Sequence, residues 1–432
     1  MPGFYVLNLG CKVNRAESDT MAASCIAAGA ERTSPEDADV AIVNTCTVTA
    51  EAEAKTRKAV RRLCRMCSCP VIVTGCAAAV DGAELAALGE RVVVEPARLR
   101  ASQMAVGLLR DAGADTDRPG AGDAFAMSSP EAAAIRASGG FKTRMDIKIQ
   151  DGCPNACTFC IVHTARGPAV SVDASEVVAQ VASAAEAGVG EVVLAGINIG
   201  CYESGGLRLP GLLDELMGTD IGRVRISSIE PPHVDAELAD VMARHGDRIC
   251  AHLHVPLQSG CARTLAAMGR LYDPAEFESR VALVRQARPE LSLTTDVIVG
   301  FPGESESDFE ESLGFCRRMG FSKMHVFRYS RRAGTPAAEL DGQVPPDVMS
   351  ERAARMRGLS DQMRLEDALS RVGSGERLLM MSPTIGMAQS YHDAVLDAPC
   401  EVGSFVDVMV TGVDVEGRLV ARHRSESSPA GR

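Results

Sequence analysis

Residues 151–160 have the sequence Asp-Gly-Cys-Pro-Asn-Ala-Cys-Thr-Phe-Cys, and they follow an alternating apolar run over residues 145–149. The run predicts a β-strand, so the loop after it brings three thiols to one strand end: Cys153, Cys157 and Cys160. A cubane iron–sulfur cluster is normally held by four thiolates, so three of them leave one iron open to another ligand. A different metal and unliganded cysteines are the alternatives, but structural zinc sites usually combine two paired half-sites, and no matching half follows here.

The length and composition of the chain indicate a globular protein of several domains. Its 432 residues predict about two to four domains, and 46% hydrophobic and 24% charged residues are ordinary values. The net charge of -12 excludes a uniformly basic surface, so a nucleic-acid partner would have to be bound by local patches. We find no signal-peptide pattern and no apolar run of membrane-spanning length. The 15 cysteines are not spaced as in a secreted disulfide scaffold, so we expect a cytoplasmic protein with no membrane partner.

The N-terminal domain, residues 1–110, alternates short apolar runs with helical patterns, which predicts a parallel α/β sheet. The predicted strands cover residues 5–9, 40–43, 71–73 and 91–94. Each of the first three is followed, two or three residues later, by a cysteine: Cys11, Cys46 and Cys76. The carboxyl ends of parallel strands share one edge, where ligands bind, so we expect these thiols to meet and hold a second cluster. The alternative is that they are small core residues.

Four other cysteines of this domain are competing candidates. Cys25 falls inside a helical pattern, which predicts a core position. Cys64, Cys67 and Cys69 form a denser group between a predicted helix and a strand, where a zinc knuckle is a possible alternative. No histidine or fourth cysteine lies near that group, so the strand-end set is favoured.

A basic run lies on the helix predicted over residues 50–64. Residues 55–65 carry six positive charges and no acidic residue. Such a run is usually a solvated helix face, but this one follows the Cys46 loop directly, where it would lead a phosphate backbone to the sheet edge. The predicted RNA-binding residues are Lys55, Arg57, Lys58, Arg61 and Arg62.

Residues 111–140 are rich in Pro, Gly and Asp, which predicts a linker to a second domain over residues 141–370. Six strand candidates in that domain, most followed by a helical pattern, predict an open, partial (βα)6 barrel. Active-site groups of such barrels come from the carboxyl ends of the strands, and glycines there let the backbone approach a cofactor. The candidate cofactor-binding residues are Phe159, Gly196, Asn198, Ser228, Gly300 and Gly303. His254 lies at the same carboxyl ends of the strands. Its alternative roles are a base, a hydrogen-bond donor or a structural residue.

The C-terminal part predicts a third, smaller unit. Short alternating runs separated by turn residues over 371–424 indicate a small antiparallel β-barrel, a shape common in RNA-binding modules. Residues 425–432 are predicted to be a disordered tail. The whole chain is therefore predicted to be an α/β multidomain protein with a parallel-sheet domain, a partial barrel and a small β-barrel.

The cysteine loop has the spacing of the radical S-adenosylmethionine enzymes, and the chain resembles their methylthiotransferase family over nearly its full length. The shared motifs lie at residues 8–14, 44–46, 74–76, 149–160, 254–260, 296–304 and 329–336, and they include Asn-Leu-Gly-Cys-Lys-Val-Asn, His-Val-Pro-Leu-Gln-Ser-Gly and Asp-Val-Ile-Val-Gly-Phe-Pro-Gly-Glu. Asn-Thr-Cys-Thr-Val-Thr at 44–49, followed by Lys-Thr-Arg at 55–57, resembles the branch that acts on N6-threonylcarbamoyladenosine in transfer RNA. The C-terminal barrel would correspond to a TRAM domain.

The resemblance implies two 4Fe–4S clusters and S-adenosylmethionine as cofactors. One cofactor molecule would methylate sulfur at the cluster of Cys11, Cys46 and Cys76. A second would be cleaved at the other cluster to a 5′-deoxyadenosyl radical, which opens carbon 2 of the adenine to methylthio insertion, since an unactivated aryl C–H needs such a radical. The implied partners are a tRNA anticodon loop and an electron donor such as flavodoxin or ferredoxin. We expect a monomer, and the sequence does not indicate the sulfur donor.

Other functions stay open at this point. Branches of the family that act on isopentenyladenosine in tRNA or on a ribosomal protein use the same clusters. An electron carrier would need neither the glycine-rich strand ends nor the RNA module, and an RNA-binding protein without chemistry would be expected to have lost cysteines. Two departures from the family pattern, Ala77-Ala-Ala79 and His163 in place of a proline, remove no ligand but bear on substrate positioning.

Overall fold

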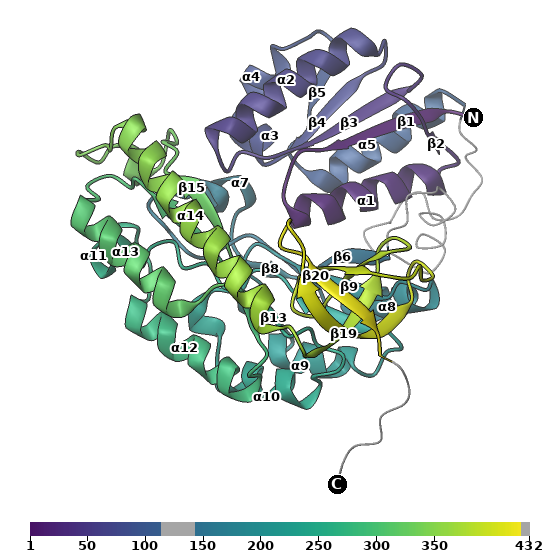
Figure 1. Cartoon of the computed structure of the whole chain (residues 1–432). Coiled ribbons are helices and arrows are strands. Elements are labelled where there is room, and N and C mark those ends of the chain that lie inside the picture. Colours follow the sequence, from purple (N-terminus) through teal and green to yellow (C-terminus); the bar gives the residue numbers. More distant parts are fainter. Residues whose placement is uncertain (114–142, 425–432) are drawn as a thin grey trace.

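The computed structural model describes residues 1–113 and 143–424. Nearly all of the predicted linker and the whole predicted tail lie outside the described residues. The chain forms three units, seen in Figure 1 as a purple α/β domain, a teal and green barrel, and a small yellow β-barrel packed against both. No helix of the described residues has the length and apolar character that crossing a membrane requires.

The N-terminal unit is a five-stranded parallel sheet in the order β2-β1-β3-β4-β5, which confirms the predicted architecture. Its strands are β1 (Gly3–Asn8), β2 (Glu31–Arg32), β3 (Val40–Thr45), β4 (Val71–Gly75) and β5 (Val92–Val94). Its helices are α1 (Lys12–Ala27), α2 (Ala50–Met66), α3 (Cys76–Val80), α4 (Gly82–Ala86) and α5 (Arg98–Asp111). Every residue of β3 and β4 is buried, because helices cover both faces of the sheet. The short edge strand β2 and helix α3 were not predicted.

The second unit is the predicted partial barrel. Its six parallel strands follow one another around the barrel: β6 (Arg144–Lys148), β9 (Glu191–Ala195), β12 (Arg223–Ile226), β13 (His252–His254), β14 (Ser292–Val299) and β15 (Lys323–Arg328). Single parallel bridges, including one between Ser228 and His254, join β12 to β13. Its longer helices are α8 (Ala174–Glu186), α9 (Leu209–Leu216), α10 (Ala236–Arg244), α12 (Pro274–Ala287), α13 (Glu306–Met319) and α14 (Pro346–Ser370). The short helix α11 (Ala262–Ala267) follows β13.

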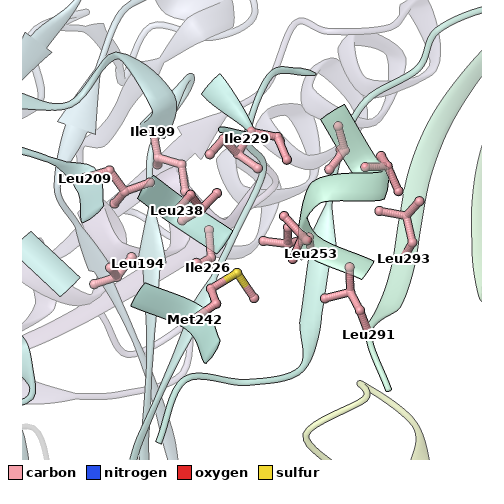
Figure 2. Packing of buried hydrophobic residues seen from close by; sticks show 14 of the residues in the cluster. Leu194, Ile199, Leu209, Ile226, Ile229, Leu238, Met242, Leu253, Leu291 and Leu293 are labelled. Atoms are coloured by element: carbon pink, nitrogen blue, oxygen red, sulfur yellow. The ribbon is translucent and has the colours of Figure 1, made fainter. Parts of the chain in front are cut away.

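The barrel core forms where strand side chains meet the inner faces of these helices (Figure 2). Leu194, Ile226 and Leu253 come from three neighbouring strands and pack near Leu238 and Met242 of α10. Helix α13 begins with a capping box, in which the Ser305 hydroxyl accepts from the Asp308 N–H and the Asp308 carboxylate accepts from the Ser305 N–H. This rigid frame holds the strand ends that carry the candidate site.

The C-terminal unit is a closed barrel in the order β16-β17-β18-β20-β19. Its strands are β16 (Gly375–Met380), β17 (Ile385–Met387), β18 (Asp393–Leu396), β19 (Phe405–Val413) and β20 (Leu419–His423). All pairings are antiparallel, as predicted, except the parallel pair β18 and β20. Two buried arginines join this barrel to β12: Arg223 donates to the Met387 carbonyl at 2.8 Å and Arg225 to the Ala388 carbonyl at 3.0 Å.

Candidate functional site

The first set of predicted ligands gathers at the carboxyl edge of the N-terminal sheet. Cys11 is the N-cap of α1, Cys46 directly follows β3, and Cys76 is the first residue of α3 after β4. Burial raises the pKa of the Cys46 thiol, and the neighbouring Cys11 and Cys76 raise it further. Thiols that influence one another in this way ionise together only where positive charge compensates them, so the group suits a metal or an iron–sulfur cluster.

The second set lies on the loop after β6 of the partial barrel. Burial raises the pKa of Cys160 to about 11, and the adjacent Cys157 and Cys153 add to that shift. Arg270 donates from Nη1 to Cys157 Sγ at 3.1 Å and forms an ion pair with Glu230. A guanidinium on this sulfur favours the thiolate, which is the form that binds iron.

A glycine shapes the start of this loop. Gly152 has φ +69°, and a Cβ at this position would lie 1.8 Å from the Pro168 carbonyl oxygen. Only glycine fits such a contact in the left-handed region. The loop therefore turns sharply at the end of its strand, which is what presents the three thiols on one side.

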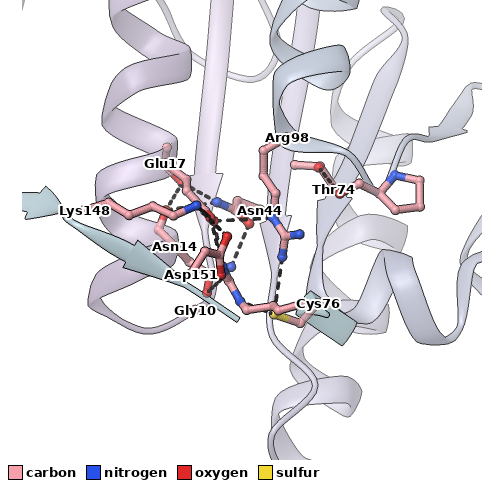
Figure 3. A network of polar contacts seen from close by, with 12 residues as sticks. Gly10, Asn14, Glu17, Asn44, Thr74, Cys76, Arg98, Lys148 and Asp151 are labelled. Carbon is pink, nitrogen blue, oxygen red and sulfur yellow. Dashed lines mark hydrogen bonds and ion pairs between the residues drawn. The ribbon is translucent and has the colours of Figure 1, made fainter. Parts of the chain in front are cut away.

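A buried network of charged side chains extends from Cys76 of the first set to Asp151, which precedes the loop of the second set (Figure 3). Glu17 of α1 accepts from Arg166 Nη1 at 2.9 Å and from Lys148 Nζ at 2.8 Å. Asp151, which precedes the second cysteine loop, accepts from the same two cations at 2.8 and 2.6 Å. Burial alone would raise the pKa of Glu17, but Arg166, Lys148 and Arg98 together hold it below its usual value. The network thus joins the N-terminal domain to the barrel through side chains that stay ionised.

The network leaves a positive charge beside Cys76. It contains three cations, Arg98, Lys148 and Arg166, and only two carboxylates. Arg166 donates from Nε to Cys76 Sγ at 3.1 Å, and its guanidinium is fully buried. Because an uncompensated buried charge is costly, this arrangement fits an anionic thiolate, or an anionic cluster, on Cys76.

The remaining observations on ligand binding agree with this. All 15 cysteines are free thiols, so both sets are available as ligands. The amide of Asn198, a predicted cofactor-binding residue, is buried and makes no regular hydrogen bond to another described residue. It lies beside Cys153, whose pKa burial raises and the amide lowers. A buried amide that makes no regular hydrogen bond to the described residues, beside a ligand set, is suited to a polar cofactor.

Most of the chain is similar in sequence to known proteins. Residues 147–316 match the Radical SAM superfamily, and residues 3–94 match Uncharacterized protein family UPF0004. The threonylcarbamoyladenosine tRNA methylthiotransferase MtaB of Bacillus subtilis is 40% identical over 368 residues, which cover 83% of this chain and 80% of that protein. The protein of the same name from Chlamydia pneumoniae is 33% identical over 96% of this chain and 97% of its own length. This chain belongs to the radical SAM methylthiotransferase family.

Other relatives mark the limits of that assignment. A tRNA-2-methylthio-N(6)-dimethylallyladenosine synthase of Bordetella avium is 31% identical over 99% of this chain and 94% of its own length. Among solved structures, a radical S-adenosylmethionine methyltransferase from Kitasatospora setae superposes with a TM-score of 0.55 at 15% identity, covering 78% of this chain and 77% of that one. That likeness shows a shared fold. The chain is thus a radical SAM methylthiotransferase whose chemistry uses S-adenosylmethionine and iron–sulfur clusters.

Two of the three predicted cofactor-binding glycines of this methylthiotransferase, Gly196 and Gly300, lie against other side chains of the protein. A Cβ on Gly196 would lie 2.6 Å from the Ile199 side chain, and one on Gly300 would lie 2.2 Å from Met349. Close packing therefore accounts for glycine at these two positions. Phe159 packs in a small apolar cluster, Ser228 lies at the bridge to β13, and Gly303 is open. Cofactor contacts of all these residues stay predictions.

The predicted RNA-binding residues lie on α2, and the structure divides them. Lys55 pairs with Glu51 at 2.8 Å, and Arg57 with Glu53 at 3.9 Å. Lys58, Arg61 and Arg62 form no ion pair with a described residue. Lys58, Arg61 and Arg62 are also exposed. The second half of the helix therefore offers the free positive charge that a phosphate backbone would meet.

The alternative cysteine group does not form a single-ion site. Within the described part of the chain, Cys64, Cys67 and Cys69 are not among the side chains whose ligand atoms converge within 4.8 Å. Cys67 instead donates to the Leu63 carbonyl, and both Cys67 and Cys69 are core residues. Cys25 is fully buried, as predicted. Among the departures from the family pattern, Ala77 and Ala78 are buried on α3, which packs against α7 (Val162–Arg166), the helix that carries His163.

Several functional side chains were not predicted. Arg166, Glu17, Lys148, Arg98 and Arg270 contact the cysteines or one another, yet each stands alone in the sequence. None of these five residues lies in the family motif at residues 329–336, but that motif does contact the site. Ser330 accepts from the Ala50 N–H at 3.1 Å and Arg332 donates to Thr47 at 2.8 Å, so this motif holds the loop of Cys46 against the barrel.

Proposed function

We propose that this methylthiotransferase adds a methylthio group to carbon 2 of N6-threonylcarbamoyladenosine, next to the anticodon of tRNA. The observation that carries the proposal is the juxtaposition of two cysteine sets across one buried charge network. It is supported by relatives named for this substrate at 33% to 40% identity over most of their length. A base held between the two sets would have both halves of the reaction within reach.

In this proposal each cysteine set holds one 4Fe–4S cluster. Cys11, Cys46 and Cys76 form the auxiliary site, and Cys153, Cys157 and Cys160 form the site that binds S-adenosylmethionine. When bound, the clusters and the cofactor supply the radical and the methylated sulfur that an unactivated C–H requires. The set of three thiolates in each case leaves one iron without a protein ligand.

The protein groups around the thiols would control their charge. Arg166 and Arg98 lie on Cys76 Sγ at 3.1 and 3.5 Å, and Arg270 lies on Cys157 Sγ at 3.1 Å. These donors stabilise thiolates and make the sulfurs weaker electron donors to iron. Asn198 and Ser228 at neighbouring strand ends would bind the polar parts of S-adenosylmethionine, and Phe159, Gly196, Gly300 and Gly303 would line its site.

The tRNA would be bound by the basic half of α2 and the C-terminal barrel. The anticodon loop is the partner we propose, because its bases can be splayed out and read individually. Replacing Arg61 or Arg62 by Ala should weaken tRNA binding and reduce the slope of log K against log salt by about 0.7 to 0.9 per lost phosphate contact. Arg317→Ala, which removes an exposed arginine from α13 on the outside of the barrel, is the matched control and should leave both unchanged.

The decisive experiment is mass spectrometry of tRNA nucleosides from cells with and without the gene. Loss of 2-methylthio-N6-threonylcarbamoyladenosine on deletion, restored by the wild type but not by Cys46→Ala or Cys157→Ala, supports the substrate and both cysteine sets. Cys25→Ala, at a buried cysteine outside both sets, is the control and should restore the nucleoside. If a methylthio group disappears from dimethylallyladenosine or from a ribosomal protein instead, the proposed substrate is wrong.

We further propose a monomeric enzyme of the cytoplasm with a flavodoxin or ferredoxin as electron donor. The described part of the chain contains no helix suited to crossing a membrane, which is compatible with this proposal. Sedimentation of the protein loaded with its clusters tests the monomer. Support of turnover by reduced flavodoxin, compared with a chemical reductant, tests the electron donor.

A further inference from the structure

A second polar cluster lies inside the barrel and contains no cysteine. It consists of His254, Asp296 and His325, each of which offers one ligand atom, and these three atoms lie within 4.8 Å of one another. They come from the adjacent strands β13, β14 and β15, and Asp296 is the register partner of His325. His254 Nε2 lies 3.4 Å from Asp296 Oδ1. Three neighbouring strands thus present polar groups at one point.

The cluster is accessible from solvent. Along β15, Met324 is buried with the barrel core, on the side covered by α14, whereas His325 and Phe327 are exposed on the other side. Phe327 is 40% exposed, a high value for a phenylalanine next to a candidate active site. Side chains that alternate along a strand point to opposite faces, so His325 and Phe327 share the open face.

Charged neighbours of both cysteine sets lie close to the cluster. On one side, Asp296 and His254 are close enough to influence the Glu230 carboxyl, whose pKa burial raises and whose partner Arg270 contacts Cys157 Sγ. On the other side, the His325 imidazole, whose pKa burial lowers, is close to the charge of Lys12, the residue after Cys11. A substrate held between the two sets would therefore place its substituents near this cluster.

The charges around the cluster favour an anion over a metal ion. Lys12 and Lys323 both act on His325, Asp296 is the carboxylate of the cluster, and the nearby Glu230 is already paired with Arg270. Two ammonium groups beside two imidazoles oppose a divalent cation and attract a carboxylate. Asp296 remains as an acceptor for a hydroxyl or N–H group of the same ligand.

We propose that His254, Asp296 and His325 form the subsite that recognises the amino-acid part of the N6 substituent. This inference rests on the proposed function. His254 and Asp296 lie in motifs that the chain shares with the family as a whole, so His325 is the residue of the cluster that would set the preference for this substituent. A threonylcarbamoyl group carries a carboxylate, a hydroxyl and ureido N–H groups, which match the donors and the acceptor of the cluster. A dimethylallyl group offers none of these, and a site built for hydrogen bonds rejects an analogue that leaves them unpaired.

The test compares three tRNAs with the enzyme loaded with its clusters under anaerobic conditions. The tRNAs carry N6-threonylcarbamoyladenosine, N6-dimethylallyladenosine or plain adenosine at the same position. His325→Leu should lower kcat/KM for the first by about 10- to 100-fold, as expected for a lost hydrogen bond to a charged group, and leave the other two within about twofold. Substrate-free cleavage of S-adenosylmethionine should stay at the wild-type rate. His325→Gln, which keeps an N–H donor, should recover part of the loss.

Controls separate the possible failures. His245→Leu, the same change at the end of α10, should behave as the wild type on all three tRNAs. If the wild type does not act on the threonylcarbamoyl substrate, the proposed function fails whatever His325 does. If the wild type prefers that substrate and His325→Leu keeps the preference, or loses activity equally on all three, the subsite is wrong. A preference that is lost when a chelator removes a divalent ion other than iron, and returns with manganese or zinc, also overturns it in favour of a metal site.

Discussion

Arg166→Ala should loosen the contact between the N-terminal domain and the barrel. The Arg166 side chain is fully buried and donates to Glu17, Asp151 and Cys76 at 2.8 to 3.1 Å. Hydrogen bonds to charged groups contribute about 1.5 to 3 kcal/mol each, but Lys148 still compensates both carboxylates after the change. We therefore expect Arg166→Ala to weaken the contact between the two units by about 3 to 5 kcal/mol, the usual cost of breaking a buried ion pair.

Hydrogen exchange is the assay for this prediction, because a chain of several domains does not unfold in one step. A loss of about 3 to 5 kcal/mol corresponds to a fall of about 160- to 4,700-fold in the protection of amides that exchange through separation of the two units. The amides to follow are those of α1 and α7. Amides in β14 should keep their protection. Iron bound per chain should also fall, because Cys76 loses its cationic partner.

Two variants complete the experiment. Arg98→Ala removes a weaker contact, 3.5 Å from both Glu17 and Cys76, and should cost about 1 kcal/mol or less. Arg166→Lys keeps the charge but loses the planar fork, so it should fall between the wild type and Arg166→Ala. Unchanged protection of α1 and α7 in Arg166→Ala, with unchanged iron content, would refute the role assigned to the network.

Three further changes have defined outcomes. Gly152→Ala places a Cβ 1.8 Å from the Pro168 carbonyl and should remove about half of the bound iron, measured by metal analysis, since it distorts one cysteine loop. Glu191→Gln leaves buried arginines at the contact with the C-terminal barrel and should destabilise it by about 3 to 5 kcal/mol, seen as lost protection in β16. Burial alone would raise the pKa of Glu191, but the arginines around it hold that pKa well below its usual value. The folded state thus binds this proton less readily than the unfolded state. The stability contributed by Glu191 is full above about pH 5 and should be lost as pH falls below about 4, in acid titrations monitored by circular dichroism.

The sequence predicted the elements of the fold because their signals are local. Apolar runs of four and three residues predicted β3 and β4, which the sheet buries completely. Strand ends then located both cysteine sets, since parallel strands share one carboxyl edge. Edge strand β2 was missed because its two residues, Glu31 and Arg32, are charged and exposed.

Features that depend on distant partners could not be predicted. Glu17 and Arg166 are 149 positions apart, and Lys148 is 131 positions from Glu17. Neither belongs to a periodic pattern, so their ion pairs have no signature in the chain. Gly196 and Gly300 are a related case, because a Cβ at either position would meet side chains of the protein itself, while their cofactor contacts stay predictions. The sequence shows where a glycine lies, but it does not show whether a cofactor or another part of the protein packs against it.

The sequence by itself determined the cysteine sets, the order of strands and helices, and the family, because ligand spacing and hydrophobic period are properties of neighbouring residues. Only the tertiary structure decided which charges lie on the cysteine sulfurs, how the two units are joined, and that His254, Asp296 and His325 converge inside the barrel. Those relations are set by the packing of one domain on another. Electrostatic pairing depends on distance in space, and distance in space is fixed only once the chain has folded.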